Sequence, residues 1–121
     1  MSRRSLRALS DNSPDIVARY DRDLRCTFVN AAITAATGRS PEDLLGRTSA
    51  EAGMPDGLAA TWDDAMRRAL AGEEGVEVDF AFPSPDGPRT FQSRLVAEPG
   101  PEGTADHVLV VTRDTTRQTL A

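Results

Sequence analysis

The sequence predicts an α+β domain, in which a five-stranded antiparallel sheet has helices inserted between strands two and three. Two observations carry this prediction. Apolar side chains form one stripe along the helical segment 57–71, and β-prone segments occur both before and after this helix. The 121 residues fit one domain, which can bury roughly two thirds of its unfolded surface. A domain of this size needs no disulfide or metal ion to fold.

The first predicted hairpin joins two β-prone runs, residues 16–20 and 26–29. Residues 21–24 have the composition of a turn, but they lack the glycine that usually takes the left-handed position, so the turn geometry is left open. Before the hairpin, Leu6 and Leu9 have helical spacing and precede a cluster of helix-stopping residues. We expect at most a short leading helix there.

Three helices are expected between the second and third strands. Asn30 is the predicted N-cap of the first helix, over residues 31–37, and Gly38 ends this helix in the left-handed conformation. Ser40 is the predicted N-cap of a second, very short helix, with Pro41 in its first turn.

The third helix is the longest, and Asp56 is its predicted N-cap. Two carboxylate and arginine pairs at i,i+4 spacing, Asp63 with Arg67 and Asp64 with Arg68, indicate an exposed face. The opposite face is an apolar stripe of Leu58, Trp62, Ala65, Met66, Ala69 and Leu70. This stripe must pack against a broad apolar surface.

The last three strands supply that surface. Residues 76–82 alternate between apolar and polar side chains, the pattern of a strand with one buried face. Residues 83–88 form a tight connection to the next strand, over residues 89–97. Residues 107–112 are almost continuously apolar, which predicts a strand in the middle of the sheet with both faces covered.

Composition limits the partners and the location that we expect. With 14 arginines, no lysine, 19 acidic residues and a net charge of −5, the chain lacks the basic face of a nucleic-acid-binding protein. The absence of lysine beside 14 arginines is typical of codon bias in a GC-rich bacterium. No apolar run could span a membrane and only one cysteine is present, so we expect a cytoplasmic protein without disulfides.

Several short motifs follow one another in a specific order. They are Tyr20-Asp21-Arg22-Asp23 leading to Phe28-Val29-Asn30, then Ala32 and Gly38, then residues 40–48, then the hairpin 82–89, and finally Arg113-Asp114-Thr115-Thr116. In this order and at these intervals, they resemble a PAS domain from Ser10 to Arg117. The resemblance implies a small sensory and dimerisation module that regulates an adjoining effector, such as a histidine kinase, phosphatase, cyclase or transcription regulator.

The resemblance also implies a domain organisation. Residues 1–10 would form an N-terminal helix or cap, residues 11–117 the PAS domain, and residues 118–121 the start of a C-terminal linker to the effector. The sequence departs from the family pattern at two positions. Arg39 stands where an aromatic residue is common, and Thr115 replaces the usual isoleucine or valine of the closing motif.

Known PAS cofactors leave marks that this sequence lacks. Flavin-binding light sensors carry a reactive cysteine in a helical Asn-Cys-Arg motif, whereas Cys26 lies on a predicted strand. Haem-binding members commonly use a histidine on the long helix, where this chain has Trp62 and Met66. We therefore expect no cofactor and no metal site, and we interpret Cys26 and His107 as structural residues.

Missing sequence motifs also disfavour enzymatic alternatives. The chain has no nucleophile elbow and no glycine-rich phosphate loop. Asp63 and Asp64 point about 100 degrees apart on a helix, so they do not form an acid and base pair. A small cone-shaped α+β enzyme with a buried aspartate and tyrosine is the least favoured alternative, since Asp79 alternates onto the outer face of its strand.

A ligand pocket between the helices and the inner face of the sheet is one hypothesis. Its candidate lining residues are Met54, Leu58, Trp62, Met66, Phe80, Phe91 and Leu95. Methionine and a tryptophan with one N–H donor suit a small, mostly apolar ligand. The same residues would also fill a solid core, and the sequence leaves these two interpretations open. Arg94 is charged in mid-strand, but alternation places it opposite Phe91 and Leu95.

The other hypothesis is a ligand-free interaction module that forms a homodimer. Leu6 and Leu9 would lie against outward residues of the sheet, such as Val96 and either Val108 or Val110. Together they would make a self-complementary apolar patch that a second copy covers.

Overall fold

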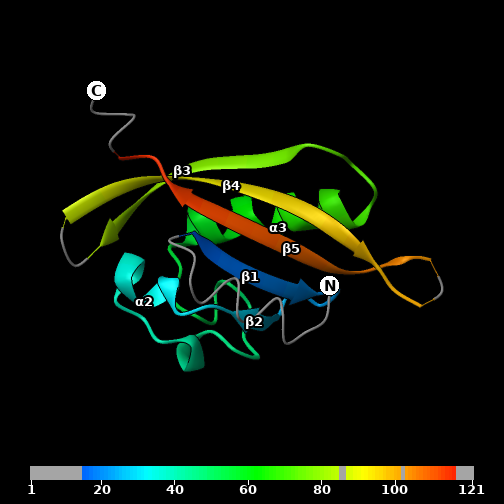
Figure 1. Ribbon diagram of the computed structural model, residues 1–121, viewed down its shortest axis with the longest axis horizontal. Coiled ribbons are helices and arrows are strands. Elements are labelled where there is room, and N and C mark those ends of the chain that lie inside the picture. Colours follow the sequence, from blue (N-terminus) through cyan, green and yellow to red (C-terminus); the bar gives the residue numbers. More distant parts are fainter. Residues whose placement is uncertain (1–14, 85–86, 102, 117–121) are drawn as a thin grey trace.

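The computed structural model describes residues 15–84, 87–101 and 103–116. In this part of the chain the elements are β1 (Ile16–Asp21), β2 (Cys26–Val29), α2 (Ala32–Thr37), the 3-10 helix η1 (Pro41–Asp43), α3 (Asp56–Leu70), β3 (Val76–Ser84), β4 (Gly87–Pro99) and β5 (Ala105–Asp114). The strands form one sheet in the order β2-β1-β5-β4-β3, and all neighbours are antiparallel (Figure 1). The predicted fold class is confirmed.

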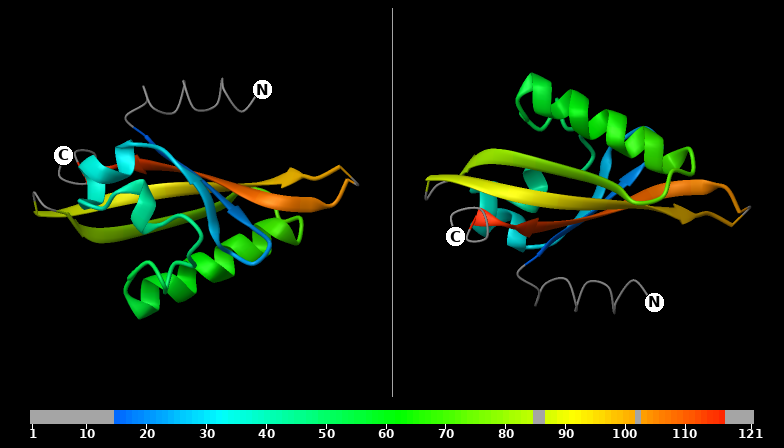
Figure 2. Two further views of the ribbon diagram at one scale, coloured as in Figure 1. Left: turned by 90° about the horizontal axis from the view of Figure 1, so that it is seen from below. Right: turned by 90° about the horizontal axis from the view of Figure 1, so that it is seen from above.

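The helices form a layer against one face of the sheet. Figure 2 shows α3 running along this face in both views. The last strand, β5, lies at the centre between β1 and β4, as its apolar sequence predicted. Its two faces differ, however: Val108 and Val110 are buried, whereas Leu109 and Val111 on the other face are only half-buried. The expectation that both faces are covered is therefore met only on the helix side.

In the turn of the first hairpin, a leucine takes the left-handed position that glycine usually takes. Leu24 takes the left-handed conformation with a φ of 64°, and its side chain is 5% exposed. The Asp21 carboxylate accepts hydrogen bonds from the backbone N–H groups of Asp23 and Arg25, at 2.9 and 3.0 Å. A buried side chain and an aspartate turn thus hold a backbone conformation that leucine ordinarily avoids.

The prediction that Asn30 caps a helix is wrong. Helix α2 begins at Ala32 with Ala31 at the N-cap position, and Asn30 is 1% exposed. Its side chain instead connects the end of β2 with the start of β1, through hydrogen bonds to the backbone of Asp15 and Val17.

The other helix ends agree closely with the sequence. Gly38 ends α2 with a φ of 80°. Ser40 and Asp43 form the capping box of η1, in which the Ser40 N–H donates to the Asp43 carboxylate at 3.0 Å. Helix α3 begins one residue earlier than predicted, with Pro55 rather than Asp56 at the N-cap position.

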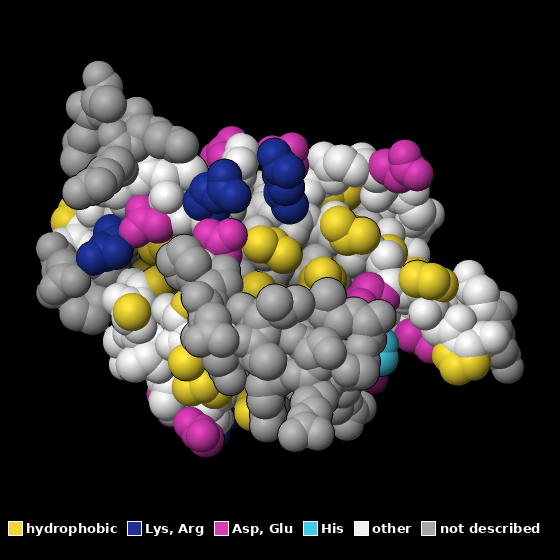
Figure 3. All heavy atoms as spheres, viewed as in Figure 1, with side chains coloured by type: hydrophobic (Ala, Val, Ile, Leu, Met, Phe, Trp, Pro, Cys, Tyr) yellow, Lys and Arg dark blue, Asp and Glu magenta, His cyan; other side chains and the backbone are white. Residues whose placement is uncertain are grey.

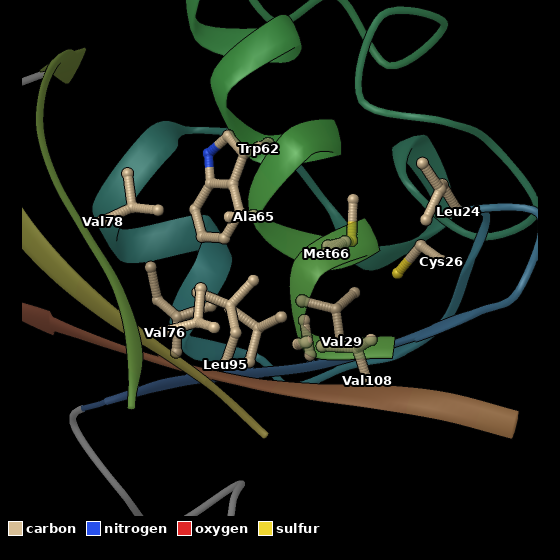
Figure 4. Packing of buried hydrophobic residues seen from close by; sticks show 14 of the residues in the cluster. Leu24, Cys26, Val29, Trp62, Ala65, Met66, Val76, Val78, Leu95 and Val108 are labelled. Atoms are coloured by element: carbon tan, nitrogen blue, oxygen red, sulfur yellow. The ribbon is translucent and has the colours of Figure 1, made fainter. Parts of the chain in front are cut away.

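The apolar stripe of α3 meets the sheet in a continuous core. Figure 4 shows Trp62, Ala65 and Met66 projecting from α3 on the side of the strands. Met66 is fully buried and Trp62 is 6% exposed. On the solvent side, Arg68 pairs with Asp64 at 3.1 Å as predicted. Asp63 and Arg67, both described residues, form no ion pair, and the Oδ1 atom of Asp63 is buried instead.

The third hairpin is longer than predicted. Residues that were expected to form a loop belong to the strands, since Pro83 pairs with Pro88 and Ser84 with Gly87 in the antiparallel register. Strand β4 therefore begins at Gly87 rather than at Arg89. Pro83 is tolerated because β3 is an edge strand, and Pro88 because the pairing of β4 with β5 begins only at Phe91.

The face of the sheet opposite α3 carries hydrophobic side chains between charged ones (Figure 3). Val96 is 59% exposed there and lies opposite Leu109 in the register of β4 and β5. The assignment of Val108 or Val110 to this face is wrong, because alternation along β5 turns both into the core. The leading helix, with Leu6 and Leu9, lies outside the described residues. Within the described ranges, no helix is long and apolar enough to cross a lipid bilayer.

Candidate ligand-binding pocket

A cavity of about 80 Å³ lies between the inner face of the sheet and the helical layer. Its lining comes from β1, β2, α2, the segment 39–54, α3 and the inner faces of β3, β4 and β5. The lining residues are Ile16, Ala18, Tyr20, Val29, Ile33, Thr37, Arg39, Leu44, Ser49, Ala52, Met54, Trp62, Phe80, Phe82, Phe91, Val110 and Thr112. The volume equals about two or three water molecules.

The structure places four of the seven predicted pocket residues on this cavity: Met54, Trp62, Phe80 and Phe91. The other three, Leu58, Met66 and Leu95, belong to the core or pack against it and are not part of the lining. They lie on the same apolar faces as the lining residues, so periodicity alone could not separate them. Whether any of the seven contacts a ligand stays a prediction.

Sequence reasoning missed the half of the pocket that precedes α3. Ile33 and Thr37 come from α2, Arg39 follows its end, and Ser49 and Ala52 come from the connection to α3. One signal could have identified part of this wall: Ile33 and Thr37 are four residues apart and thus share a helix face. The connecting segment has no periodicity that would reveal its contacts.

Three aromatic rings form one wall of the cavity. The centroids of Trp62 and Phe80 are 5.5 Å apart in an edge-to-face arrangement, and those of Phe80 and Phe91 are 5.3 Å apart and stacked. Both geometries are favourable for aromatic quadrupoles. The three rings come from α3, β3 and β4 and hold the helix against the edge of the sheet.

Trp62 also brings an unused hydrogen-bond donor to the site. The side chain is 6% exposed, and its Nε1 atom is buried without a hydrogen-bond partner among the described residues. A buried N–H without an acceptor costs about 1–3 kcal/mol. Such a group is uncommon in a finished core, and a ligand acceptor would satisfy it.

Arg39 is the charged residue of the lining. Its guanidinium donates to the backbone carbonyl of Ala52 and, at 3.3 Å, to that of Gly53. These contacts fasten the connecting segment to the end of α2. Arg94, the mid-strand arginine considered from the sequence, is exposed on the opposite face, as alternation predicted.

A second group of polar side chains lies near Tyr20, a lining residue of β1. Burial raises the pKa of the Tyr20 phenol well above its ordinary value, and the nearby Cys26 and Asp63 raise it further, whereas the Ser49 hydroxyl opposes the rise. The Oδ1 atom of Asp63 is buried and has no hydrogen-bond partner in the described part of the chain. Tyr20 therefore stays a neutral phenol beside the cavity.

Cys26 is a buried residue beneath this group, with 2% exposure. Its Sγ donates to the backbone carbonyl of Phe28 at 3.4 Å. Burial raises the pKa of the thiol to about 11, although the hydrogen bond to Phe28 works in the opposite direction. The thiolate is the reactive form, so this cysteine is inert at neutral pH.

The end of β5 is tied firmly to β4. Asp114 accepts a hydrogen bond from the Arg89 guanidinium at 2.9 Å and from the Thr116 N–H at 2.9 Å. Desolvation raises the pKa of the Asp114 carboxyl, but these bonds outweigh it and hold the pKa below its usual range. Thr115, the departure from the closing motif, donates to the Thr90 hydroxyl at 3.1 Å. A polar partner on β4 thus accommodates threonine at this position.

Comparison with family models decides the identity of the fold. The model for the PAS fold matches residues 10–120. The chain belongs to the PAS family. No curated protein matches the sequence.

Solved structures of PAS domains have the same architecture. The PAS domain of BvgS from Bordetella pertussis is 21% identical with a TM-score of 0.77, over 97% of this chain and 89% of that one. A sensory box histidine kinase from Vibrio cholerae is 17% identical with a TM-score of 0.67, over 93% and 90% of the two chains. These TM-scores show a shared fold.

A third similar structure is VqmA from Vibrio cholerae, which is described as a dimeric LuxR-type receptor. It is 20% identical with a TM-score of 0.79, over 98% of this chain and 53% of that one. This PAS domain thus spans about half of the VqmA chain. Its structural neighbours occur both in histidine kinases and in DNA-binding regulators.

Proposed function

We propose that this PAS domain is a non-enzymatic sensor that binds a small, mostly apolar ligand in the cavity and thereby regulates an adjoining effector. The observation that carries the proposal is an apolar cavity lined by Trp62, a residue whose buried N–H has no partner among the described residues. A solid core would leave no such space. Among the effectors that the sequence suggested, a histidine kinase or a transcription regulator is supported by the structural neighbours.

The size of the cavity limits the ligand. Pockets for drug-sized ligands measure about 300–1,000 Å³, several times the volume found here. A flavin or haem would therefore require a large rearrangement of the lining, and we propose that neither is bound. The ligand is a molecule of few heavy atoms.

The strand β5, which lines the cavity, leads toward the end of the domain where we propose that a linker to an effector begins. Val110 and Thr112 of β5 line the cavity, and Asp114 lies two residues beyond Thr112 in the clamp with Arg89. A ligand that shifts β5 at Thr112 would act directly on this clamp. We propose this short path as the route of the signal.

Substitution within the lining tests the proposal. Ala52 lines the cavity, whereas Ala50 in the same segment is exposed and lies outside the lining. In a screen of small metabolites against the full domain, Trp62 fluorescence should report binding that Ala52→Leu abolishes and Ala50→Leu preserves. Binding that is unaffected by Ala52→Leu, or a clean native mass together with no response across the panel, would contradict a ligand pocket here.

Dimerisation is a second proposed function, favoured by the exposed Val96 on the face of the sheet opposite α3. Its register neighbour Leu109 extends the apolar surface toward β5. A second copy that covers this face would remove both side chains from water. Light scattering should show a dimer that Val96→Asp dissociates and the neighbouring exposed Arg94→Asp weakens less; a monomeric wild-type protein would contradict dimerisation.

A further inference from the structure

We propose that the cavity accepts a small apolar molecule that ends in a single carboxylate, with Arg39 as the counter-ion. This inference rests on the proposed function, because it names the chemical class of the ligand. It depends on two observations: no carboxylate of the described residues pairs with Arg39, and the nitrogen donors of the lining favour an acceptor.

Several arginines form ion pairs with carboxylates, whereas the Arg39 guanidinium has only backbone carbonyls as partners among the described residues. Its guanidinium contacts the backbone carbonyls of Ala52 and Gly53. In the described part of the chain, no carboxylate lies within ion-pair distance of it. Ion pairs do occur elsewhere, between Arg19 and Glu98, Arg25 and Glu51, Arg68 and Asp64, and Arg89 and Asp114. Arg39 therefore brings a positive charge to the cavity that the lining does not neutralise.

The guanidinium has donors to spare for a ligand. An arginine side chain carries five N–H donors, and the two carbonyls engage only part of them. A carboxylate matches two of these donors at once, and such charge-assisted pairs are roughly twice as strong as neutral hydrogen bonds. A ligand carboxylate would bind the free donors of Arg39, or it would compete for the guanidinium with the carbonyls of Ala52 and Gly53.

The remaining polar groups also favour an acceptor. Trp62 offers an N–H that has no partner within the described ranges, and indole nitrogen can only donate. The Thr37 hydroxyl already donates to the Ile33 carbonyl at 2.7 Å. No acidic or amide side chain belongs to the lining found in the described residues. The Tyr20 and Ser49 hydroxyls of the lining bond to each other, and the Thr112 hydroxyl bonds to Ser93. An acceptor on the ligand would satisfy Trp62 or Arg39.

Charge and volume restrict the class further. Arg39 is the one charged side chain of the lining found in the described residues, so it balances one anionic charge, and a phosphate or dicarboxylate would bury a second charge without a partner. The volume of about 80 Å³ is roughly half that of a cavity of about 150 Å³ known to bind benzene. Short branched carboxylates are therefore the appropriate probes.

Matched acids and amides test the inference. Isobutyrate with isobutyramide, and isovalerate with isovaleramide, differ in charge but hardly in shape. Because Trp62 is the single tryptophan of the sequence, its indole N–H gives one resolved signal in a ¹⁵N spectrum. Titration of the full domain should show that each acid binds at least about tenfold more tightly than its amide, as one added charge-assisted pair predicts.

Variants connect this preference with Arg39. Arg39→Met should remove the preference and Arg39→Lys should keep part of it. Arg47→Met is the matched control and should leave it intact, because Arg47 is exposed, donates to the Asp43 carbonyl and lies outside the lining. If Arg39→Met does not fold, the wild-type comparison and Arg39→Lys still decide the question.

The outcomes separate this inference from the proposed function. Equal affinity for acid and amide in the wild-type protein would overturn the carboxylate class but support a ligand pocket. A preference that survives Arg39→Met would overturn the role of Arg39. No response to any of the four probes would also contradict the inference, while the wider metabolite panel with Ala52→Leu decides on the pocket itself.

Discussion

Asn30 clamps the backbone of Val17 from both sides: its N–H donates to the Val17 carbonyl at 2.9 Å, and its Oδ1 accepts from the Val17 N–H at 3.0 Å. The Nδ2 atom donates to the Asp15 carbonyl at 2.9 Å. The side chain is 1% exposed, so water cannot replace these bonds. Asn30 therefore fixes the start of β1 against the end of β2.

Asn30→Ala should lower the free energy of unfolding by about 2–3 kcal/mol, because it removes the side-chain acceptor of the buried Val17 N–H and a donor to the half-buried Asp15 carbonyl. Denaturant titration measures the change. Gln92→Ala is the control, since Gln92 lies on the outer face and its amide donates to Glu77 at 3.0 Å in an exposed pair. We expect that variant to lose less than about 1 kcal/mol. Equal losses in both variants would contradict the clamp.

Leu24→Gly should also destabilise the domain, although it relieves a left-handed φ. Relief of the backbone contributes about 1–2 kcal/mol, whereas removal of a buried leucine side chain costs about 2–5 kcal/mol. Burial dominates, so the net loss should be about 1–3 kcal/mol by thermal or chemical unfolding. An unchanged or higher stability would show that relief of the left-handed φ outweighs the loss of the buried side chain.

Ser93 and Thr112 form a buried hydroxyl pair across β4 and β5, at 2.6 Å. Ser93→Ala should cost about 1–3 kcal/mol, because the Thr112 hydroxyl loses its partner. Adding Thr112→Val should restore part of the stability, since the double variant has no unpaired hydroxyl. A double-mutant cycle measures this coupling. Strictly additive losses would contradict the paired arrangement.

Because the Cys26 thiol is buried, we expect the free energy of unfolding to fall at alkaline pH. The pKa of its thiol is raised from 9.0 to about 11 in the folded protein. Between these values the unfolded chain loses the thiol proton while the folded domain keeps it, so rising pH favours unfolding. Tyr20, whose pKa is also raised, contributes in the same direction. Cys26→Ala should therefore reduce the slope of stability against pH above about pH 9 without abolishing it.

Thiol labelling gives an independent check of the same residue. Because Cys26 is the single cysteine, Ellman's reagent reports on it alone. Labelling at pH 8 should be slow in the native protein and fast in denaturant. Fast native labelling, or an unchanged pH slope in Cys26→Ala, would contradict a buried and protonated thiol.

The sequence predicted those parts of the fold that follow from local chemistry. Period-two alternation located β3, and Gly38 and Ser40 marked the helix ends because their effects are confined to neighbouring residues. Asn30 was misassigned because its partners lie in β1, outside any local window. For the same reason, Val108 and Val110 could not be placed on a face until the register of β5 was known.

The pocket was only partly predictable for a related reason. Aromatic and methionine residues on the apolar faces indicated Met54, Trp62, Phe80 and Phe91. Leu95 and Met66 have the same character, and only three-dimensional packing shows that they fill the core. Arg39 was noted as a departure from the family pattern, but its place beside the cavity depends on the course of the connecting segment.

The central claim is that the interior holds a cavity accessible to a small ligand. Xenon enters dry apolar cavities and shifts the NMR signals of the methyl groups that surround it. Under xenon pressure, the methyl signals of Ile33 and Val110, which line the cavity, should shift strongly, and those of Val76, which is buried outside it, should not. Absent shifts at Ile33 and Val110, or equal shifts at all three residues, would contradict the cavity and the sensor built on it.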